Sequence, residues 1–320
     1  MPYLILLLFL LSCNHQPLSK GVISLNKTPV KNHTWKDLCV NGPRLEEINT
    51  NLLFSYDTPE KNMWFESLQK QPKGVFLILH GLNLRPSKMN TLAHYWASQG
   101  YEVLRGTLSG HFGSREEMKA VTRMTWHRDV SNLICLSLLK AKSKGVPLYF
   151  LGYSLGAAAV LDTLKTQGVQ NPFEKMILLA PAIRVKWYAN LTKVVSFFSN
   201  RVMIPSGNLK EYRSQSGTST AAYKALHSII NNISSPYTSL NVPTWIYLDP
   251  NDELISEKGL LDMTKDSGLN LWSLKKVKKS NSSLSENYHH LIIDPPTLGH
   301  ESFEKMTIDM KSFIESPSLK

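Results

Sequence analysis

The stretch that decides the fold reads LYFLGYSLGAAAV over residues 148–160. Its first four residues are apolar on both faces, as in a strand buried within a parallel sheet, and its last residues are small and begin a helical pattern. Between them lies a Gly-x-Ser-x-Gly motif centred on Ser154. In this context a sharp turn lifts the serine Oγ above the strand end, so the residues two positions away must lack a bulky Cβ. The motif predicts a nucleophilic Ser154; the alternative is a tight turn with a capping serine.

Strands of this kind alternate with helices along the chain. Short apolar runs bounded by Gly, Pro or polar residues predict strands at 75–79, 101–104, 148–151, 176–179 and 245–248, with a more polar last strand at 269–277. Apolar residues at helical spacing predict helices at 89–96, 130–138, 155–166 and 303–313. The alternation favours an α/β fold with a mostly parallel central sheet flanked by helices.

The composition is that of a globular protein. Of the 320 residues, 42% are hydrophobic and 9% aromatic, which is too apolar for a disordered chain. Three cysteines are too few for a disulfide scaffold. The net charge is +11, and the densest basic stretch is residues 275–279. Because no aromatic-rich signature surrounds it, this stretch predicts a solvated strand end or loop and no nucleic-acid partner. The alternative is attraction to an anionic membrane surface.

The amino terminus has the pattern of an export signal. Residues 4–11 form an apolar run that is too short to span a bilayer and typical of a signal peptide. The run ends in Leu-Leu-Ser-Cys at Cys13, which resembles a bacterial lipobox, although no Lys or Arg precedes it. We therefore expect a signal peptide at 1–12, lipidation of Cys13, and a polar tether at 13–32. This predicts a lipoprotein anchored in the bacterial cell envelope; the alternative is a plain signal peptide and a soluble periplasmic or secreted protein.

The other two cysteines leave two interpretations. A disulfide between Cys39 and Cys135 is chemically allowed after export. The apolar neighbours of Cys135, at 133, 134 and 136, favour a buried free thiol instead.

Two backbone amides are candidates for binding an oxyanion. The strand at 75–79 ends in His80-Gly81-Leu82, where Gly81 allows a sharp turn. The amides of Leu82 and Leu155 would then both point at the site. His80 could act as a base, but its position beside the turn favours a buried structural histidine.

The acid and the base follow later strands. Asp252 lies just before an apolar pair that could begin a helix, and it is favoured over Asp249, which a turn role suits better. Of two adjacent histidines only one can point into a site. We favour His289 as the base, with His290 and then His300 as the alternatives.

These motifs together resemble the α/β-hydrolase superfamily of serine esterases. The matching residues are His80-Gly81-Leu82, residues 108–113, the motif around Ser154, Asp252-Glu253-Leu254-Ile255, and Tyr288-His289 with Leu291. The order Ser, Asp, His along the chain is that of the superfamily. The resemblance is to the branch of monoacylglycerol lipases, lysophospholipases and bacterial carboxylesterases, where a Tyr often precedes the histidine and a Leu follows two positions later. That pattern supports His289. Phe112 departs from the usual Gly-His-Gly.

The resemblance also implies a division of the chain. The hydrolase core would comprise 33–181 and 243–320, interrupted by a helical lid at 182–242, where no clear parallel strand appears. Aromatic residues in the lid, Trp187, Phe197 and Phe198, suggest an apolar acyl group.

The implied activity is hydrolysis of carboxylic esters, of acylglycerols or lysophospholipids, through a Ser-His-Asp triad and an acyl-enzyme. It implies a small-molecule or lipid ester substrate, and neither a metal nor an organic cofactor. Alternatives are a thioesterase, a peptidase or an acyltransferase on the same fold, or a catalytically silent envelope module that binds lipid. The sequence does not indicate the oligomeric state.

Overall fold

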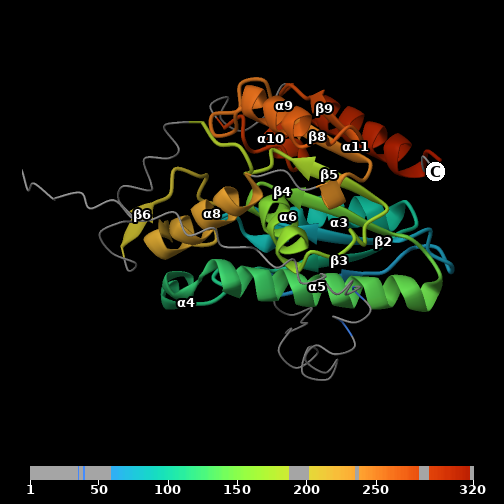
Figure 1. Ribbon diagram of the computed structural model, residues 1–320, viewed down its shortest axis with the longest axis horizontal. Coiled ribbons are helices and arrows are strands. Elements are labelled where there is room, and N and C mark those ends of the chain that lie inside the picture. Colours follow the sequence, from blue (N-terminus) through green and yellow to red (C-terminus); the bar gives the residue numbers. More distant parts are fainter. Residues whose placement is uncertain are drawn as a thin grey trace, which may run out of the picture. The chain divides into compact units, whose positions relative to one another are not determined.

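A seven-stranded sheet forms the centre of the protein (Figure 1). The computed structural model describes Trp35, Cys39 and residues 59–186, 202–234, 238–280 and 288–317. The strand order is β1-β3-β2-β4-β5-β8-β9. The strands are β1 (Met63–Phe65), β2 (Val75–Leu79), β3 (Glu102–Gly106), β4 (Leu148–Tyr153), β5 (Lys175–Leu179), β8 (Thr244–Leu248) and β9 (Trp272–Lys276). All neighbours pair parallel except β1, which pairs antiparallel with β3.

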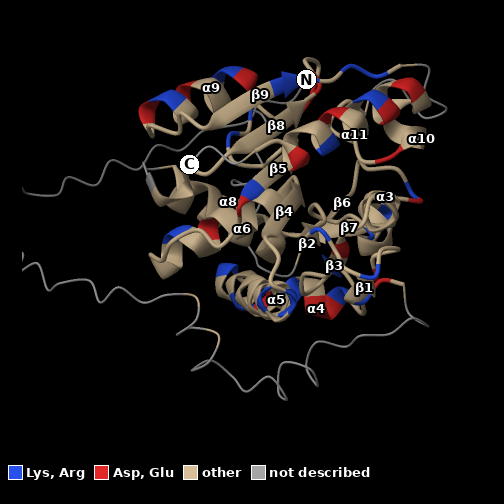
Figure 2. Ribbon diagram, turned by 90° about the vertical axis from the view of Figure 1, so that its right-hand side faces the viewer, with Lys and Arg blue, Asp and Glu red and all other residues tan. Residues whose placement is uncertain are grey.

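Helices cover both faces of this sheet. Among the described residues, the α-helices are α3 (Asn90–Ser98), α4 (Arg115–Ala120), α5 (Arg123–Lys144), α6 (Leu155–Gln167), α8 (Thr220–Ile233), α9 (Glu257–Asp266), α10 (Pro295–Leu298) and α11 (His300–Glu315), and the short 3₁₀ helices are η1 (Pro86–Met89) and η3 (Thr238–Leu240). Figure 2 shows α3 and α11 on one side of the strands and α6 with α8 on the other. The Tyr95 hydroxyl of α3 donates to the Thr307 carbonyl of α11, 2.8 Å away, which ties the first pair together.

The apolar runs become the core of the sheet, as predicted. Every residue of β2, β4 and β5 is buried, because helices cover these strands on both faces. The last strand lies at the edge, and this explains its polar composition. Its lysines lie on that edge: the Lys275 Nζ is 4.0 Å from the centre of the Trp245 ring, and Lys276 pairs with Glu257 at 2.8 Å. The short strand β1 has no counterpart in the sequence prediction.

The segment after β5 contains more than helices. The described part of this segment contains one α-helix, α8, as expected for a helical lid, and it is preceded by a two-stranded antiparallel sheet of β6 (Met203–Pro205) and β7 (Gly217–Ser219). These strands have three residues each, too short for an alternating pattern to be recognised. The aromatic residues Trp187, Phe197 and Phe198 lie outside the described residues.

Residues 209–215 of this segment bind the turn that follows β2. The Arg85 amide donates to the Tyr212 carbonyl at 2.7 Å, and the Ser214 amide donates to the Asn83 carbonyl at 3.1 Å. The Asn83 Oδ1 accepts from the Ser214 hydroxyl and the Gln215 amide, at 2.9 and 2.8 Å.

The cysteine prediction was wrong, because Cys39 and Cys135 form a disulfide. Cys135 is buried on α5, as its apolar neighbours indicate, but Cys39 is buried against it, with the Cα atoms 5.4 Å apart. Apolar surroundings therefore did not distinguish a free thiol from a paired one. Both cysteines belong to the compact unit His33–Lys320. The predicted signal peptide, Cys13 and the tether lie outside the described residues, and none of the described helices is long and apolar enough to cross a membrane.

Candidate active site

Parallel strands bring the candidate residues to one edge of the sheet. Ser154 follows β4, the turn at 80–84 follows β2, and Asp252 follows β8. The carboxyl ends of parallel neighbours lie at the same edge, which is where open α/β sheets place their ligand sites. His290 reaches this edge from the loop between β9 and α10.

Ser154 sits in the strained turn that its motif predicts. Its backbone has φ 49° and ψ −111°, a left-handed conformation that costs energy for any residue with a Cβ. The flanking glycines are required by packing: a Cβ on Gly152 would lie 2.8 Å from the Ala157 Cα, and one on Gly156 would lie 2.7 Å from the Leu79 and His80 carbonyl oxygens. The Ser154 amide donates to the Leu179 carbonyl of β5 at 2.9 Å, which holds the turn in place.

His290 joins Ser154 to Asp252. The His290 Nε2 is 3.0 Å from the Ser154 Oγ, and the His290 Nδ1 is 2.9 Å from the Asp252 Oδ2. The structure thus brings together Ser154 and Asp252, as the sequence indicates, with a histidine between them. The expectation of His289 in that place is wrong, because the neighbouring residue occupies it.

The backbone of the histidine loop explains this correction. The Leu291 amide donates to the Tyr288 carbonyl at 3.2 Å, so residues 288–291 form a tight turn. The His290 amide donates to the Glu253 carboxylate at 2.9 Å, which fixes the side of the turn that faces Asp252. The His289 Nδ1 instead lies 3.3 Å from the Asp249 carboxylate, without a hydrogen bond to it in the described structure. His300, the third candidate, is exposed at the start of α11.

Asp252 is held as an anion. Its Oδ1 accepts the amides of Leu254 and Ile255, both at 2.8 Å, and its Oδ2 faces His290. Burial alone would raise the pKa of Asp252, but His290 and these two amides lower it below its usual range. Burial alone would lower the pKa of His290, but Asp252 and Glu253 raise it above its usual range. The pair therefore favours a negative Asp252 and a His290 that readily accepts a proton.

The two amides predicted to bind the oxyanion belong to Leu82, in the turn after β2, and to Leu155, which directly follows Ser154. Leu155 is the first residue of α6, so its amide has no acceptor in the helix. Leu82 follows Gly81, where a Cβ would lie 3.2 Å from the Ser154 Cβ. Neither amide donates a hydrogen bond within the described part of the chain. Both are therefore available to a negative oxygen beside Ser154.

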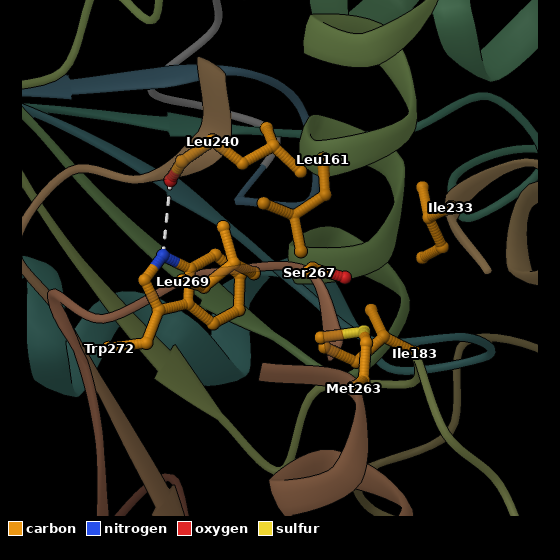
Figure 3. A pocket seen from close by; sticks show the side chains of 8 residues that line it. All are labelled: Leu161, Ile183, Ile233, Leu240, Met263, Ser267, Leu269 and Trp272. Carbon is orange, nitrogen blue, oxygen red and sulfur yellow. Dashed lines mark hydrogen bonds between the residues drawn. The ribbon is translucent and has the colours of Figure 1, made fainter. Parts of the chain in front are cut away.

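Two cavities lie away from these residues. A cavity of about 10 Å³ lies between α6, α9 and β9. Figure 3 shows Leu161, Met263 and Trp272 among the side chains that line it. It has room for about one water molecule, and the Trp272 Nε1 beside it donates to the Leu240 carbonyl at 3.1 Å. A larger cavity of about 510 Å³ lies beside residues 107–112. The residues that line either cavity do not include Ser154, Asp252 or His290. Among the described residues, no group of His, Cys, Asp and Glu side chains could hold a metal ion.

The sheet, the serine turn and the Ser, Asp, His order are those of an α/β-hydrolase. The chain matches the family model described as serine aminopeptidase, S33, over residues 70–296, and it belongs to this family. The fold is also that of a soluble variant of monoglyceride lipase from Saccharomyces cerevisiae, solved with a substrate analogue. That structure has a TM-score of 0.65 at 17% identity, covering 81% of this chain and 92% of that one.

Two curated relatives match part of the chain. Phospholipase YtpA of Bacillus subtilis (strain 168) is 25% identical over 137 residues, which are 42% of this chain and 51% of that protein. A monoglyceride lipase homolog of Monkeypox virus is 27% identical over 137 residues, which are 42% of this chain and 48% of that protein. The chain thus spans about half the length of the curated relatives it matches.

Proposed function

We propose that the protein is a serine hydrolase that cleaves carboxylic esters of acylglycerols or lysophospholipids. The observation that carries this proposal is the hydrogen-bonded row of Ser154, His290 and Asp252, with donor–acceptor distances of 3.0 and 2.9 Å. The partial matches to a phospholipase and to a monoglyceride lipase homolog support the substrate class.

The geometry supports a two-step reaction. The His290 Nε2 removes the Ser154 proton as the Oγ attacks the ester carbonyl, and the protonated imidazole then gives that proton to the leaving alcohol. Water, activated by the same imidazole, hydrolyses the acyl-enzyme and returns the free serine. Asp252 keeps the Nδ1 proton on the imidazole and stabilises the positive charge that forms. The amides of Leu82 and Leu155 donate to the oxyanion of each tetrahedral intermediate.

The first test is covalent labelling. A fluorophosphonate probe is expected to react with the wild-type serine and not with Ser154→Ala, whereas His289→Ala, the matched control, should be labelled as wild type. Absence of labelling in the wild-type protein would favour the silent lipid-binding module and would contradict the proposal.

The second test separates leaving groups. Monoacylglycerols, lysophospholipids and p-nitrophenyl esters of increasing chain length are compared with acyl thioesters and with aminoacyl p-nitroanilides. Faster turnover of the lipid esters is expected. A higher kcat/KM for the anilides would replace the esterase with an aminopeptidase, the activity after which the family is described.

We also propose that the protein is an envelope lipoprotein anchored through Cys13. The Cys39–Cys135 disulfide supports export, because disulfides persist mainly in oxidising compartments. Labelled palmitate should be incorporated into the wild-type protein in a bacterial host and not into Cys13→Ser. Equal incorporation in both would contradict the anchor.

A further inference from the structure

We propose that the buried side chain of His80 sets the direction of the Leu82 amide, and so positions this oxyanion donor, with His111 holding the same turn from the other side. This inference rests on the proposed function. It assigns to both histidines a positioning role in which neither ring has to contact the substrate.

The hydrogen bonds of His80 determine where its proton lies. Its Nε2 is 3.0 Å from the Leu108 amide nitrogen, which can only donate, so the Nε2 must accept. In the neutral imidazole the proton is then on the Nδ1, which lies 2.9 Å from the Gly81 carbonyl oxygen. His80 therefore donates to Gly81 and cannot serve as the base for Ser154.

The Gly81 carbonyl and the Leu82 amide belong to the same peptide unit. In a planar trans peptide the C=O and N–H bonds point in opposite directions. A hydrogen bond that fixes the Gly81 oxygen on the His80 side therefore turns the Leu82 N–H to the opposite side. The same bond polarises the peptide, which strengthens the donor.

His111 fixes the next peptide unit in the same way. Its Nε2 accepts from the Asn83 amide at 3.0 Å, and its Nδ1 is 3.2 and 3.3 Å from the carbonyl oxygens of Leu108 and Ser109. The Asn83 backbone has φ 51°, in the left-handed region that few residues other than Gly and Asn adopt. The units on both sides of Leu82 are thus attached to one loop, residues 108–111, through two imidazoles.

Both histidines must be neutral for this arrangement, and their surroundings keep them so. Both are buried, with ring centres 4.5 Å apart. Burial, helped by His111 and Arg105, keeps the pKa of His80 well below its usual range. Burial lowers the pKa of His111 to about 4. Protonation of either Nε2 would destroy an acceptor that a backbone amide needs.

Two substitutions at His80 separate positioning from packing. The Asn amide nitrogen occupies roughly the place of the Nδ1, so His80→Asn keeps a donor for Gly81 and loses the acceptor for Leu108. The Gln amide oxygen occupies roughly the place of the Nε2, so His80→Gln keeps the acceptor for Leu108 and loses the donor for Gly81. The two variants remove one hydrogen bond each from the same site.

We expect kcat for His80→Gln to fall by about 10- to 100-fold, less than the roughly 10²–10³-fold loss that removal of a whole oxyanion donor causes. KM should stay near the wild-type value, and a trifluoromethyl ketone, which forms a charged adduct with the serine, should bind more weakly by the factor by which kcat/KM falls. His80→Asn should lose less kcat and less inhibitor affinity than His80→Gln. Equal losses in both variants, or a loss of kcat without weaker binding of the ketone, would overturn the proposal.

The wild-type protein provides a second measurement if a variant does not fold. Long-range ¹H–¹⁵N spectra of the imidazoles should show both His80 and His111 as the Nδ1-protonated neutral form; an Nε2-protonated His80 would overturn the proposal. Failure of the proposed function is seen separately, as a wild-type protein that neither reacts with fluorophosphonate nor cleaves any ester.

Discussion

Two histidine–aspartate pairs stand side by side in this site, and only one of them reaches the serine. In the first pair the Nδ1 of His290 is 2.9 Å from Asp252, and in the second the Nδ1 of His289 is 3.3 Å from Asp249. The side chain of His290 is 10% exposed and that of His289 is 25% exposed. The residue types are the same in the two pairs, but only the His290 Nδ1 makes a hydrogen bond with its aspartate; the His289 Nδ1 has no hydrogen-bond partner within the described structure.

The difference comes from the other partners of each aspartate. The Asp252 Oδ1 accepts two amides of its own loop, which leaves the Oδ2 directed at His290. The carboxylate of Asp249 accepts the Asn251 and Lys279 amides, at 2.8 and 3.3 Å, and closes a turn. Whether a histidine–carboxylate pair can act as a base therefore depends on the group that its Nε2 faces. For His290 that group is Ser154.

Removal of each histidine should give the largest contrast. His290→Ala is expected to lower kcat by a factor on the order of 10⁶, because the serine loses its only proton acceptor at hydrogen-bond distance within the described structure. His289→Ala should leave kcat close to wild type. Initial rates with a p-nitrophenyl ester measure both, and a comparable loss in the two variants would show that the pairs act together.

Neutralising each aspartate is the next largest contrast. Asp252→Asn should lower kcat by about 10⁴-fold, because the amide no longer fixes the Nδ1 proton of His290. Asp249→Asn keeps an oxygen that can accept the Asn251 amide, so its kcat should remain near wild type. Circular dichroism spectra of both variants control for folding. The interpretation fails if Asp249→Asn is the more damaged enzyme.

The pH dependence of kcat/KM gives the smallest but most specific contrast. His290 must be neutral to accept the serine proton, and its folded-state pKa is raised by Asp252 and Glu253 despite burial. Activity should therefore rise with pH through a value above the usual pKa of about 6.5 for histidine. Glu253→Gln removes one negative charge beside His290 and should move this limb to lower pH. The pH profile of His289→Ala should coincide with that of wild type. A shifted limb in this variant would mean that His289, and not His290, is the group that titrates.

The stability of the fold should also depend on pH, through a different histidine. The unfolded His111 binds a proton near pH 6.5, whereas burial lowers its folded pKa to about 4. Protonation of His111 therefore favours the unfolded state. The stability that the fold owes to this difference in pKa is present above pH 6.5 and is lost as pH falls toward 4. The loss for this one group is about 3 kcal/mol. Urea unfolding of wild type between pH 7 and pH 4 should show a steeper loss than His111→Gln; identical curves would contradict this assignment.

The sequence alone is enough to predict a structural feature where all the residues that determine it lie in one short segment. The turn at Ser154 needs small residues two positions away on each side, and Gly152 and Gly156 supply them within five residues. Buried strands such as β2 and β4 are likewise visible as short apolar runs.

The sequence alone is not enough to predict a structural feature that depends on contacts with a distant part of the chain. The choice between His289 and His290 depends on Glu253, which lies on another loop and holds the His290 amide. The disulfide depends on Cys39 reaching α5 from a part of the chain with no readable pattern. The pairing of His80 with Leu108, and of His111 with Asn83, also joins segments that only the parallel sheet brings together.

The attachment of residues 209–215 to the turn after β2 has a consequence for how such enzymes are recombined. Besides its bond to Arg85, Tyr212 donates its hydroxyl to Asp294 at 2.8 Å, four residues beyond His290. A chimaera that exchanged the whole segment after β5 would replace the residues that hydrogen-bond to the turn after β2 and to the loop that carries His290. An exchange of this segment between relatives should therefore use junctions that leave residues 209–215 with their own core.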